Sequence, residues 1–393
     1  MGSLNLNLNS MKKIGLTIAR WAVGILFLFS GIAKGIDPVG FEYKLSDYID
    51  ALQLKILDIL VTPGAFLLPF AEFLIGITLL TGILIRISTK VALGFMLIFT
   101  PLTLYIALKN PVTDCGCFGD ALVITNWETF YKNVVLIILV VLLLLNRKSL
   151  GFLISLTFRK IIFLIVLISY ILVVSWSLRH EPILDFRPYK IGVNIPEGMT
   201  IPQGAPTDVY QNSYLYKNKF SKEVKKFGDH DFPWQDTLHW KFESMDRPLL
   251  VKKGYRPPIH DFSIQTIDQQ NVTDNYLHDS IHTFFVITYD LEKSSHEKQK
   301  ELNLLANWAK QKGFRFIGLT STSGEGLRNY QLEQKPTYDI LFTDQTTLKT
   351  IIRSNPGLIL LRKGTILGKW AEADFPSPSK AEAYINAQTT NLK

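Results

Sequence analysis

The feature that most constrains this chain of 393 residues is a series of long apolar runs between about residues 14 and 178. A membrane-spanning helix needs roughly 20 mostly apolar residues. Five segments reach or approach that length: 14–33, 65–85, 91–108, 127–145 and 161–178. The first lacks a small-residue cleavage site before Lys34, and further runs follow it, which argues against a cleaved signal peptide. The sequence therefore predicts a helical membrane bundle of five spans, kinked at Pro101 in the third.

The charges between these runs predict how the bundle is oriented. One set of loops carries nine basic residues and no acid, whereas 35–64 and 109–133 together carry eight acids and four lysines. The positive-inside rule then places the N-terminus in the cytoplasm and the C-terminal region outside, which in a bacterium is the periplasm. Residues 1–178 hold 14 basic and 9 acidic residues, so +5 of the net charge of +8 reflects topology. No basic stripe with interleaved aromatic residues is present, and nucleic-acid binding is not expected.

The only two cysteines, Cys115 and Cys117, lie in the stretch DCGCFGD, in the loop between the third and fourth predicted spans. When a chain bends at a residue such as Gly116, the Cα atoms of residues i and i+2 come within about 6 Å, a distance that suits a disulfide. Closing so small a ring removes only about 1.5 kcal/mol from the unfolded state, and strained, exposed disulfides are readily reduced. The pair is therefore predicted to be a redox centre rather than a structural staple. The flanking Asp114 and Asp120 would raise the thiol pKa values.

Charged side chains inside the predicted spans are further candidates, because a charge is costly in a bilayer and usually functional there. Arg20 lies six residues into the first span, Lys34 caps its outer end, and Glu72 lies seven residues into the second span. With a rise of about 1.5 Å per residue, Glu72 lies about 10 Å from the outer end of its helix. A Glu72–Lys34 pair is therefore expected below the cysteine loop if the helices adjoin. The alternative for Arg20 and Lys34 is snorkelling to the nearer interface.

Beyond residue 178 the sequence is typical of a soluble protein. Residues 179–258 are rich in proline and aromatic side chains and predict extended segments and turns. From residue 259 onward, buried-strand runs alternate with amphipathic helical segments and close on two strands joined at Lys363-Gly364. This alternation predicts a mixed sheet flanked by helices. His278 and His282 have the spacing of metal ligands, but His282 opens a strand, and no metal site is expected.

The order of these elements resembles the thioredoxin fold, in particular periplasmic thioredoxin-like and peroxiredoxin-like domains. The segment DFSIQTIDQQNVT is similar to the opening of such domains, and Pro356 in SNPGLILL matches their cis-proline. The family's redox cysteines follow the first central strand, but the corresponding stretch 289–295 and the rest of the domain contain none. A domain without thiols cannot exchange disulfides. We therefore expect it to bind a partner, the alternative being a domain that only folds and fills space.

Three stretches of the membrane part, RWAVGILFLFSGIAKGIDP, LLPFAEFLIGITLLTG and DCGCFGD, resemble the DoxX/MauE superfamily of small bacterial membrane proteins. The residues that fall where this family keeps its patterned positions are Arg20, Gly31, Lys34, Asp37, Glu72 and the Cys-Gly-Cys loop. The resemblance covers about residues 12–146, and the remainder looks like an extended form of the family. It implies a role in disulfide maturation, as in MauE-type members, or in quinone-linked thiol oxidation, as in DoxX-type members, with a membrane quinone as cofactor.

These observations predict a chain of five parts. A leader (1–11), whose sequence is uninformative and in which Met1 and Met11 are alternative starts, precedes a DoxX/MauE-like four-helix membrane domain (12–146). A cytoplasmic loop with the fifth span (147–178), a connecting segment (179–258) and a thioredoxin-like domain without CxxC (259–393) follow. The predicted function is that of an inner-membrane thiol–disulfide oxidoreductase acting through Cys115 and Cys117 on a periplasmic protein partner. One alternative is a non-catalytic scaffold whose cysteine-free domain binds that partner. Another is a small-solute permease using Arg20 and Glu72, which the absence of an internal repeat disfavours.

Overall fold

The computed structural model describes residues 2–112, 115–149, 155–252 and 254–391. Two compact units divide the chain. The first comprises Met1–Val193 together with Ser263–Lys393, and the second comprises Asn194–Phe262. The first unit therefore contains both the apolar helices and the C-terminal α/β domain.

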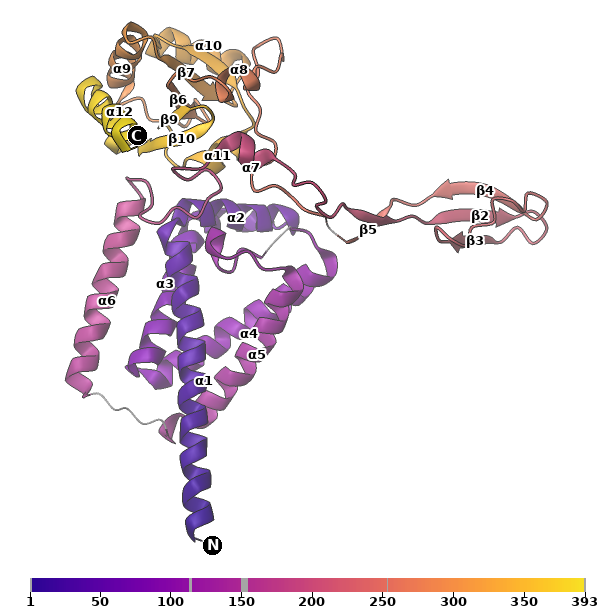
Figure 1. Cartoon of the computed structure of the whole chain (residues 1–393). Coiled ribbons are helices and arrows are strands. Elements are labelled where there is room, and N and C mark those ends of the chain that lie inside the picture. Colours follow the sequence, from indigo (N-terminus) through magenta and orange to yellow (C-terminus); the bar gives the residue numbers. More distant parts are fainter. Residues whose placement is uncertain (1, 113–114, 150–154, 253, 392–393) are drawn as a thin grey trace. The chain divides into compact units, whose positions relative to one another are not determined.

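Five segments of the described chain are long and apolar enough to cross a membrane: Met11–Ile36, Lys55–Thr81, Ile85–Lys109, Asn126–Leu145 and Leu156–Ser177. They belong to helices α1 (Gly2–Ile36), η1 (Lys55–Leu60) with α3 (Val61–Thr81), α4 (Ile85–Lys109), α5 (Asn126–Leu145) and α6 (Leu156–Ser177), as Figure 1 shows. The predicted number of spans is confirmed. The predicted second span runs too far, because Gly82 adopts a left-handed conformation with φ of +70° and ends α3 at Thr81.

Helices α1 and α3 form the tightest helix pair of the membrane part. A Cβ added at Gly31 would collide with the backbone of Phe73, and one added at Gly76 would collide with the backbone of Leu28. Small residues at such positions let two helix backbones approach closely inside a membrane. This close approach brings the middle of α3 against the last third of α1, where Lys34 lies.

Two further elements complete the membrane part. Helix α2 (Pro38–Ala51), which was not predicted, starts directly after α1. Asp37 caps its first turn, and the Asp37 carboxylate accepts a hydrogen bond of 2.8 Å from the amide of Gly40. Helix α6 packs on α1 and α3 through Tyr170, whose ring stacks on Phe73 with centroids 4.0 Å apart. The start of α5 is held by a reciprocal capping box between Thr125 and Glu128.

The C-terminal domain is built on a five-stranded sheet in the order β10-β9-β6-β7-β8. Strands β6 (Thr283–Thr288), β7 (Arg315–Thr320) and β8 (Asp339–Phe342) are parallel, and β9 (Gly357–Arg362) and β10 (Thr365–Ala371) form the antiparallel hairpin. The connecting and flanking helices are α8 (Thr273–Leu277), α9 (Gln299–Gln311), α10 (Gly324–Gln334), α11 (Gln345–Ile351), η4 (Glu372–Asp374) and α12 (Pro378–Asn391). Helices α9 and α12 pack on one face of the sheet (Figure 1). The Asn355–Pro356 peptide is cis, and the predicted thioredoxin-like α/β fold is confirmed.

The second unit consists mainly of small sheets. Strand β1 (Val209–Gln211) pairs with β5 (Leu249–Lys252), and β2 (Tyr214–Asn218) lies between β3 (Val224–Phe227) and β4 (Trp240–Met245). Extended segments and turns dominate this region, as the sequence predicts. The unit also contains α7 (Ile195–Met199), a short helix that the sequence pattern did not indicate and that is started by the side chain of Asn194.

Candidate functional site

The two thiols lie in contact in a loop that the backbone shapes tightly. Cys115 Sγ and Cys117 Sγ are 3.0 Å apart, and both cysteines are free. Gly116 between them and Gly119 after them have φ values of +56° and +55°, which glycine adopts without the penalty of a Cβ. Forming a disulfide bond of about 2.05 Å would require the sulfurs to approach by about 1 Å. The loop is therefore folded so that the two sulfurs can react with each other.

A buried ion pair lies directly beneath this loop. Lys34 Nζ donates hydrogen bonds of 2.8 Å to both carboxylate oxygens of Glu72. Ser30, one helical turn before Lys34, places its hydroxyl 2.9 Å from Glu72 Oε2 and 2.6 Å from the carbonyl oxygen of Cys117. Because a hydroxyl carries one proton, it donates to one of these acceptors at a time. Ser30 thus links the ion pair to the backbone of the redox loop.

The thiols and the ion pair line one cavity of about 540 Å³. Most of its wall is apolar and comes from α1, α2, α3, α4 and α5. Its polar lining includes Ser30, Lys34, Tyr48, Glu72, Thr103, Cys115, Cys117, Lys132 and Asn133. Ligand-binding cavities typically have volumes of roughly 300–1,000 Å³, with apolar walls and a few convergent polar groups. This cavity has both properties.

The pKa values of the two thiols are shifted in opposite directions. A hydrogen bond from the Cys115 thiol lowers the pKa of Cys117 to about 6, with help from the charges of Lys132 and Lys34 and against the effect of burial. The same hydrogen bond, together with burial, raises the pKa of Cys115 far above its usual range. At neutral pH the reduced pair therefore carries one proton, on Cys115, and one thiolate, at Cys117.

The other predicted residues lie at different distances from this centre. Arg20 is buried in α1, but it is fourteen residues from Lys34, about 21 Å along the helix, and belongs to a different level of the bundle. Asp114 lies outside the described residues. Asp120 lies in the 3-10 turn Gly119–Ala121 and reaches toward Arg353, whose Nη2 is 3.4 Å from its Oδ2.

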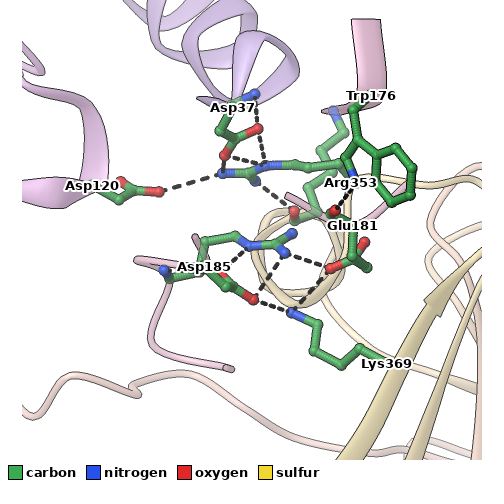
Figure 2. Close-up of polar contacts among 10 residues, drawn as sticks. Asp37, Asp120, Trp176, Glu181, Asp185, Arg353 and Lys369 are labelled. Carbon is green, nitrogen blue, oxygen red and sulfur yellow. Dashed lines mark hydrogen bonds and ion pairs between the residues drawn. The ribbon is translucent and has the colours of Figure 1, made fainter. Parts of the chain in front are cut away.

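Asp37 and Arg353 form an ion pair between the membrane part and the C-terminal domain. Arg353 Nε and Nη2 lie 3.0 and 2.8 Å from Asp37 Oδ2, and Figure 2 shows the guanidinium between Asp37 and Asp120. Although burial raises it, the charge and hydrogen bonds of Arg353 bring the pKa of Asp37 below its usual range. Pro356 follows three residues after Arg353, so the cis-proline loop lies close to this contact.

Sequence reasoning missed three residues of this region. Ser30 had a signal, since it precedes Lys34 by four residues and so lies on the same face of the helix. Lys132 lies in the first turns of α5, and its Nζ is 4.5 Å from the centroid of the Phe118 ring. Arg353 had no local signal, because its partners are more than two hundred residues away in the sequence.

Comparisons with known proteins agree with this division of the chain. The family described as methylamine utilisation protein MauE matches residues 12–146. No curated protein matches the chain.

Solved structures that resemble the chain cover about a third of it. A thiol:disulfide interchange protein from Bacteroides sp. has 15% identity and a TM-score of 0.25, and the match covers 33% of this chain and 84% of that one. A thiol:disulfide interchange protein of the thioredoxin family from Chlorobium tepidum has 14% identity and a TM-score of 0.26, with 32% and 91% covered. A secreted disulfide oxidoreductase from Mycobacterium tuberculosis has 12% identity and a TM-score of 0.25, with 32% and 96% covered.

Similarity this low says nothing about the chemistry of the chain, and the fold of its C-terminal part follows from its own strand order. The sheet order β10-β9-β6-β7-β8, with the last hairpin antiparallel to the central strand, defines that fold. The chain therefore joins a membrane domain, similar to the MauE family over residues 12–146, to a C-terminal α/β domain of thioredoxin-like fold.

Proposed function

We propose that this membrane protein is a thiol–disulfide oxidoreductase that oxidises a periplasmic protein partner through Cys115 and Cys117. The observation that carries the proposal is the 3.0 Å contact between the two sulfurs in the lining of a cavity that also contains the Lys34–Glu72 pair. A structural disulfide would need neither a cavity nor buried charges beside it. The acidity of the loop and the distribution of charge along the chain support a reaction on the outer face of the bacterial inner membrane.

The charges of Lys132 and Lys34, which lower the pKa of Cys117, support different roles for the two cysteines. In thiol–disulfide exchange, the sulfur with the lower thiol pKa is the better leaving group. A thiolate of the partner therefore attacks Cys115 Sγ, the Cys115–Cys117 bond breaks, and Cys117 leaves as a thiolate stabilised by Lys132 and Lys34. The second thiolate of the partner then attacks the partner's own sulfur in the mixed disulfide, and the bond to Cys115 breaks. The partner leaves oxidised, and Cys115 Sγ takes up the proton that the partner's second thiol has lost. Two electrons have moved from the partner to the loop.

The loop must pass these two electrons on, and a membrane quinone is the acceptor we propose. The apolar wall of the cavity suits a quinone ring and the start of its isoprenoid tail, and Lys34, Lys132 and Asn133 are the donors in its lining that would hold the quinone oxygens. When bound, a quinone supplies an acceptor for two electrons and two protons. Glu72 contributes a carboxylate to the lining, and the hydrogen bonds that it accepts from Lys34 and Ser30 hold it in place for proton transfer.

The test uses the full-length protein in detergent micelles. The protein is reduced, the reductant is removed, and a short-chain water-soluble quinone is added while free thiols are counted by mass-tagging. We expect both thiols to disappear together with one equivalent of quinone, whereas Cys117→Ser should consume none. Thiols that stay free in the presence of quinone would remove quinone from the proposal.

A second measurement separates the enzyme from a scaffold. A reduced model dithiol protein is mixed with the oxidised chain, and its oxidation is followed with and without quinone. Turnover that requires both cysteines supports an oxidoreductase. If a Cys115→Ser/Cys117→Ser variant still supports the maturation of periplasmic proteins in cells, the oxidoreductase hypothesis is refuted and the scaffold hypothesis remains.

A further inference from the structure

Among the residues that the structure describes, Arg353 is the side chain through which the C-terminal domain reaches the redox loop. Arg353 follows α11 and lies three residues before the cis-proline. Its guanidinium contacts Asp37 at the end of α1 and Asp120 in the turn after the cysteines (Figure 2). An Arg–carboxylate contact made through two nitrogens is both strong and geometrically specific. Only 13% of the Arg353 side chain is exposed, so solvent competes weakly for these hydrogen bonds.

Both carboxylates belong to segments that hold the thiol site. Asp37 lies three residues after Lys34 and caps α2, so it fixes the corner at which α1 turns into α2. Asp120 lies three residues after Cys117, in a turn where a Cβ on Gly119 would be 3.5 Å from the carbonyl oxygen of Ala33. The turn therefore rests on the last residues of α1. Arg353 ties the α1–α2 corner and this turn together from the side of the C-terminal domain.

A second contact from the same side holds the backbone of Arg353. The hydroxyl of Tyr289, directly after β6, lies 3.1 Å from that of Tyr43 on α2 and donates to the carbonyl oxygen of Arg353 at 3.2 Å. Lys349 Nζ lies 4.6 Å from the centroid of the Tyr43 ring. At Gly40, a Cβ would lie 2.5 Å from Arg353 Nη2, so the absence of a side chain there makes room for the guanidinium.

The domain has other attachments to the segment that follows α6, and these do not involve the thiol site. His180 Nδ1 lies 2.8 Å from Asp374 Oδ1, and the amide of Gly192 donates to the carbonyl oxygen of Ile366 at 2.8 Å. Lys369 on β10 pairs with Asp185 at 2.7 Å. Removing Arg353 would therefore leave the domain attached. The contacts to Asp37 and Asp120 are the ones that reach the redox loop.

We propose that the C-terminal domain acts within the same chain as a positioning element for the thiol loop, and that Arg353 is the positioning residue through which it acts. The domain thereby has a role that needs no cysteine of its own. Its significance for catalysis rests on the function proposed above, but the contact and its effect on the thiols can be measured without any turnover.

The experiment measures how fast the reduced full-length protein in detergent micelles is alkylated by a small neutral maleimide. Arg353→Gln removes the contact from the C-terminal domain, and Asp37→Asn weakens it from the membrane part while retaining a capping side chain at that position. We expect each variant to be alkylated about fivefold faster or more, the lower end of typical coupling between sites. The double variant should be no faster than the faster single variant, because both changes remove one contact.

Three further variants, one test and two controls, distinguish loss of this contact from general damage. Gly40→Ala crowds the guanidinium without changing a charge and should also accelerate alkylation. Gly94→Ala is the matched control, because a Cβ there meets no atom within 4 Å. Lys312→Gln breaks an exposed 2.6 Å ion pair with Glu382 inside the C-terminal domain and should leave the rate unchanged.

Alkylation rates within about twofold of the parent for both Arg353→Gln and Asp37→Asn, well below typical coupling, would overturn the proposal. Faster alkylation in the Gly94→Ala or Lys312→Gln control would overturn it as well, since the effect would then be general. Because alkylation needs no oxidant, these outcomes do not depend on whether quinone reoxidises the loop. A loop that responds to Arg353 but never reacts with quinone would refute the proposed function alone.

Discussion

Two buried lysines, Lys34 in the membrane part and Lys369 in the C-terminal domain, have almost the same immediate chemistry. Lys34 Nζ is 2.8 Å from Glu72, and Lys369 Nζ is 2.7 Å from Asp185. Their surroundings differ. Lys34 lines a cavity together with two thiols, whereas Lys369 shares its carboxylates with Arg187, whose side chain is 2% exposed.

The role of a buried ion pair therefore depends on which other groups and cavities adjoin it. In a second cluster, Lys369 and Arg187 pair with Asp185 and Glu181 and join the segment after α6 to strand β10. Figure 2 shows Lys369 beside Asp185 and Glu181. Although burial raises it, the hydrogen bond and charge of Arg187 together with the charge of Lys369 hold the pKa of Asp185 far below its usual range. The Lys34–Glu72 pair instead faces space that a ligand can enter and lies beside a thiolate that its charge affects.

The largest effect is expected for Lys34→Met. This change leaves the Glu72 carboxylate buried without its cation, and breaking a buried pair in this way typically costs about 3–5 kcal/mol. The pKa of Cys117 should also rise, because the Lys34 charge helps to lower it. Unfolding in detergent micelles and the pH dependence of maleimide alkylation measure the two effects. In Lys34→Met/Glu72→Leu most of the stability should return, because an apolar pair replaces the ionic one.

Lys369→Met should lower the free energy of unfolding by about 3 kcal/mol, since the cluster then keeps two carboxylates and a single cation. Here the alkylation of Cys117 should keep its pH midpoint, because Lys369 has no part in the thiol site. Thermal unfolding followed by the near-ultraviolet signal of Trp370 and its neighbours, together with the same alkylation titration, tests both statements. A shifted pH midpoint of Cys117 alkylation would contradict the distinction between Lys34 and Lys369.

Cys115→Ala tests which group lowers the pKa of Cys117 most. The hydrogen bond from Cys115 is the largest cause, and the lysine charges are smaller ones. Without that bond the pKa should rise from about 6 toward about 8.5, which reduces the thiolate fraction at pH 7 by about 30-fold. Alkylation rates between pH 5 and pH 9 measure this directly. An unchanged midpoint would mean that Lys34 and Lys132 are sufficient.

The smallest effect is expected for Tyr43→Phe. It removes one hydroxyl from the 3.1 Å contact with Tyr289, and a single hydrogen bond contributes about 1 kcal/mol. Tyr289→Phe should cost slightly more, because that hydroxyl also donates to the carbonyl oxygen of Arg353. A double-mutant cycle on unfolding in micelles yields the coupling between them. Fully additive losses would mean that the two hydroxyls do not interact.

Much of the fold could be predicted because it depends on local patterns. Runs of apolar residues predict the five spans, and alternating strand and helix patterns predict the C-terminal domain, with the hairpin turn at Lys363-Gly364 in place. The Lys34–Glu72 pair could be anticipated from helix geometry once two adjacent spans were assumed. Helix α2 was missed because its polar surface resembles that of a loop, and its start depends on the cap provided by Asp37.

The sequence alone was sufficient to predict a membrane half and an α/β half, and to place both thiols in one loop between two membrane-spanning helices. Hydropathy, charge and the positions of two cysteines are properties of the chain alone. Three features are visible only in the tertiary structure. Ser30 contacts both the ion pair and the redox loop, and an apolar cavity lies beside them. Arg353 contacts Asp37 and Asp120. These contacts join residues that are 42 to 316 positions apart, and contacts over such distances arise only when the packing of whole elements brings the residues together.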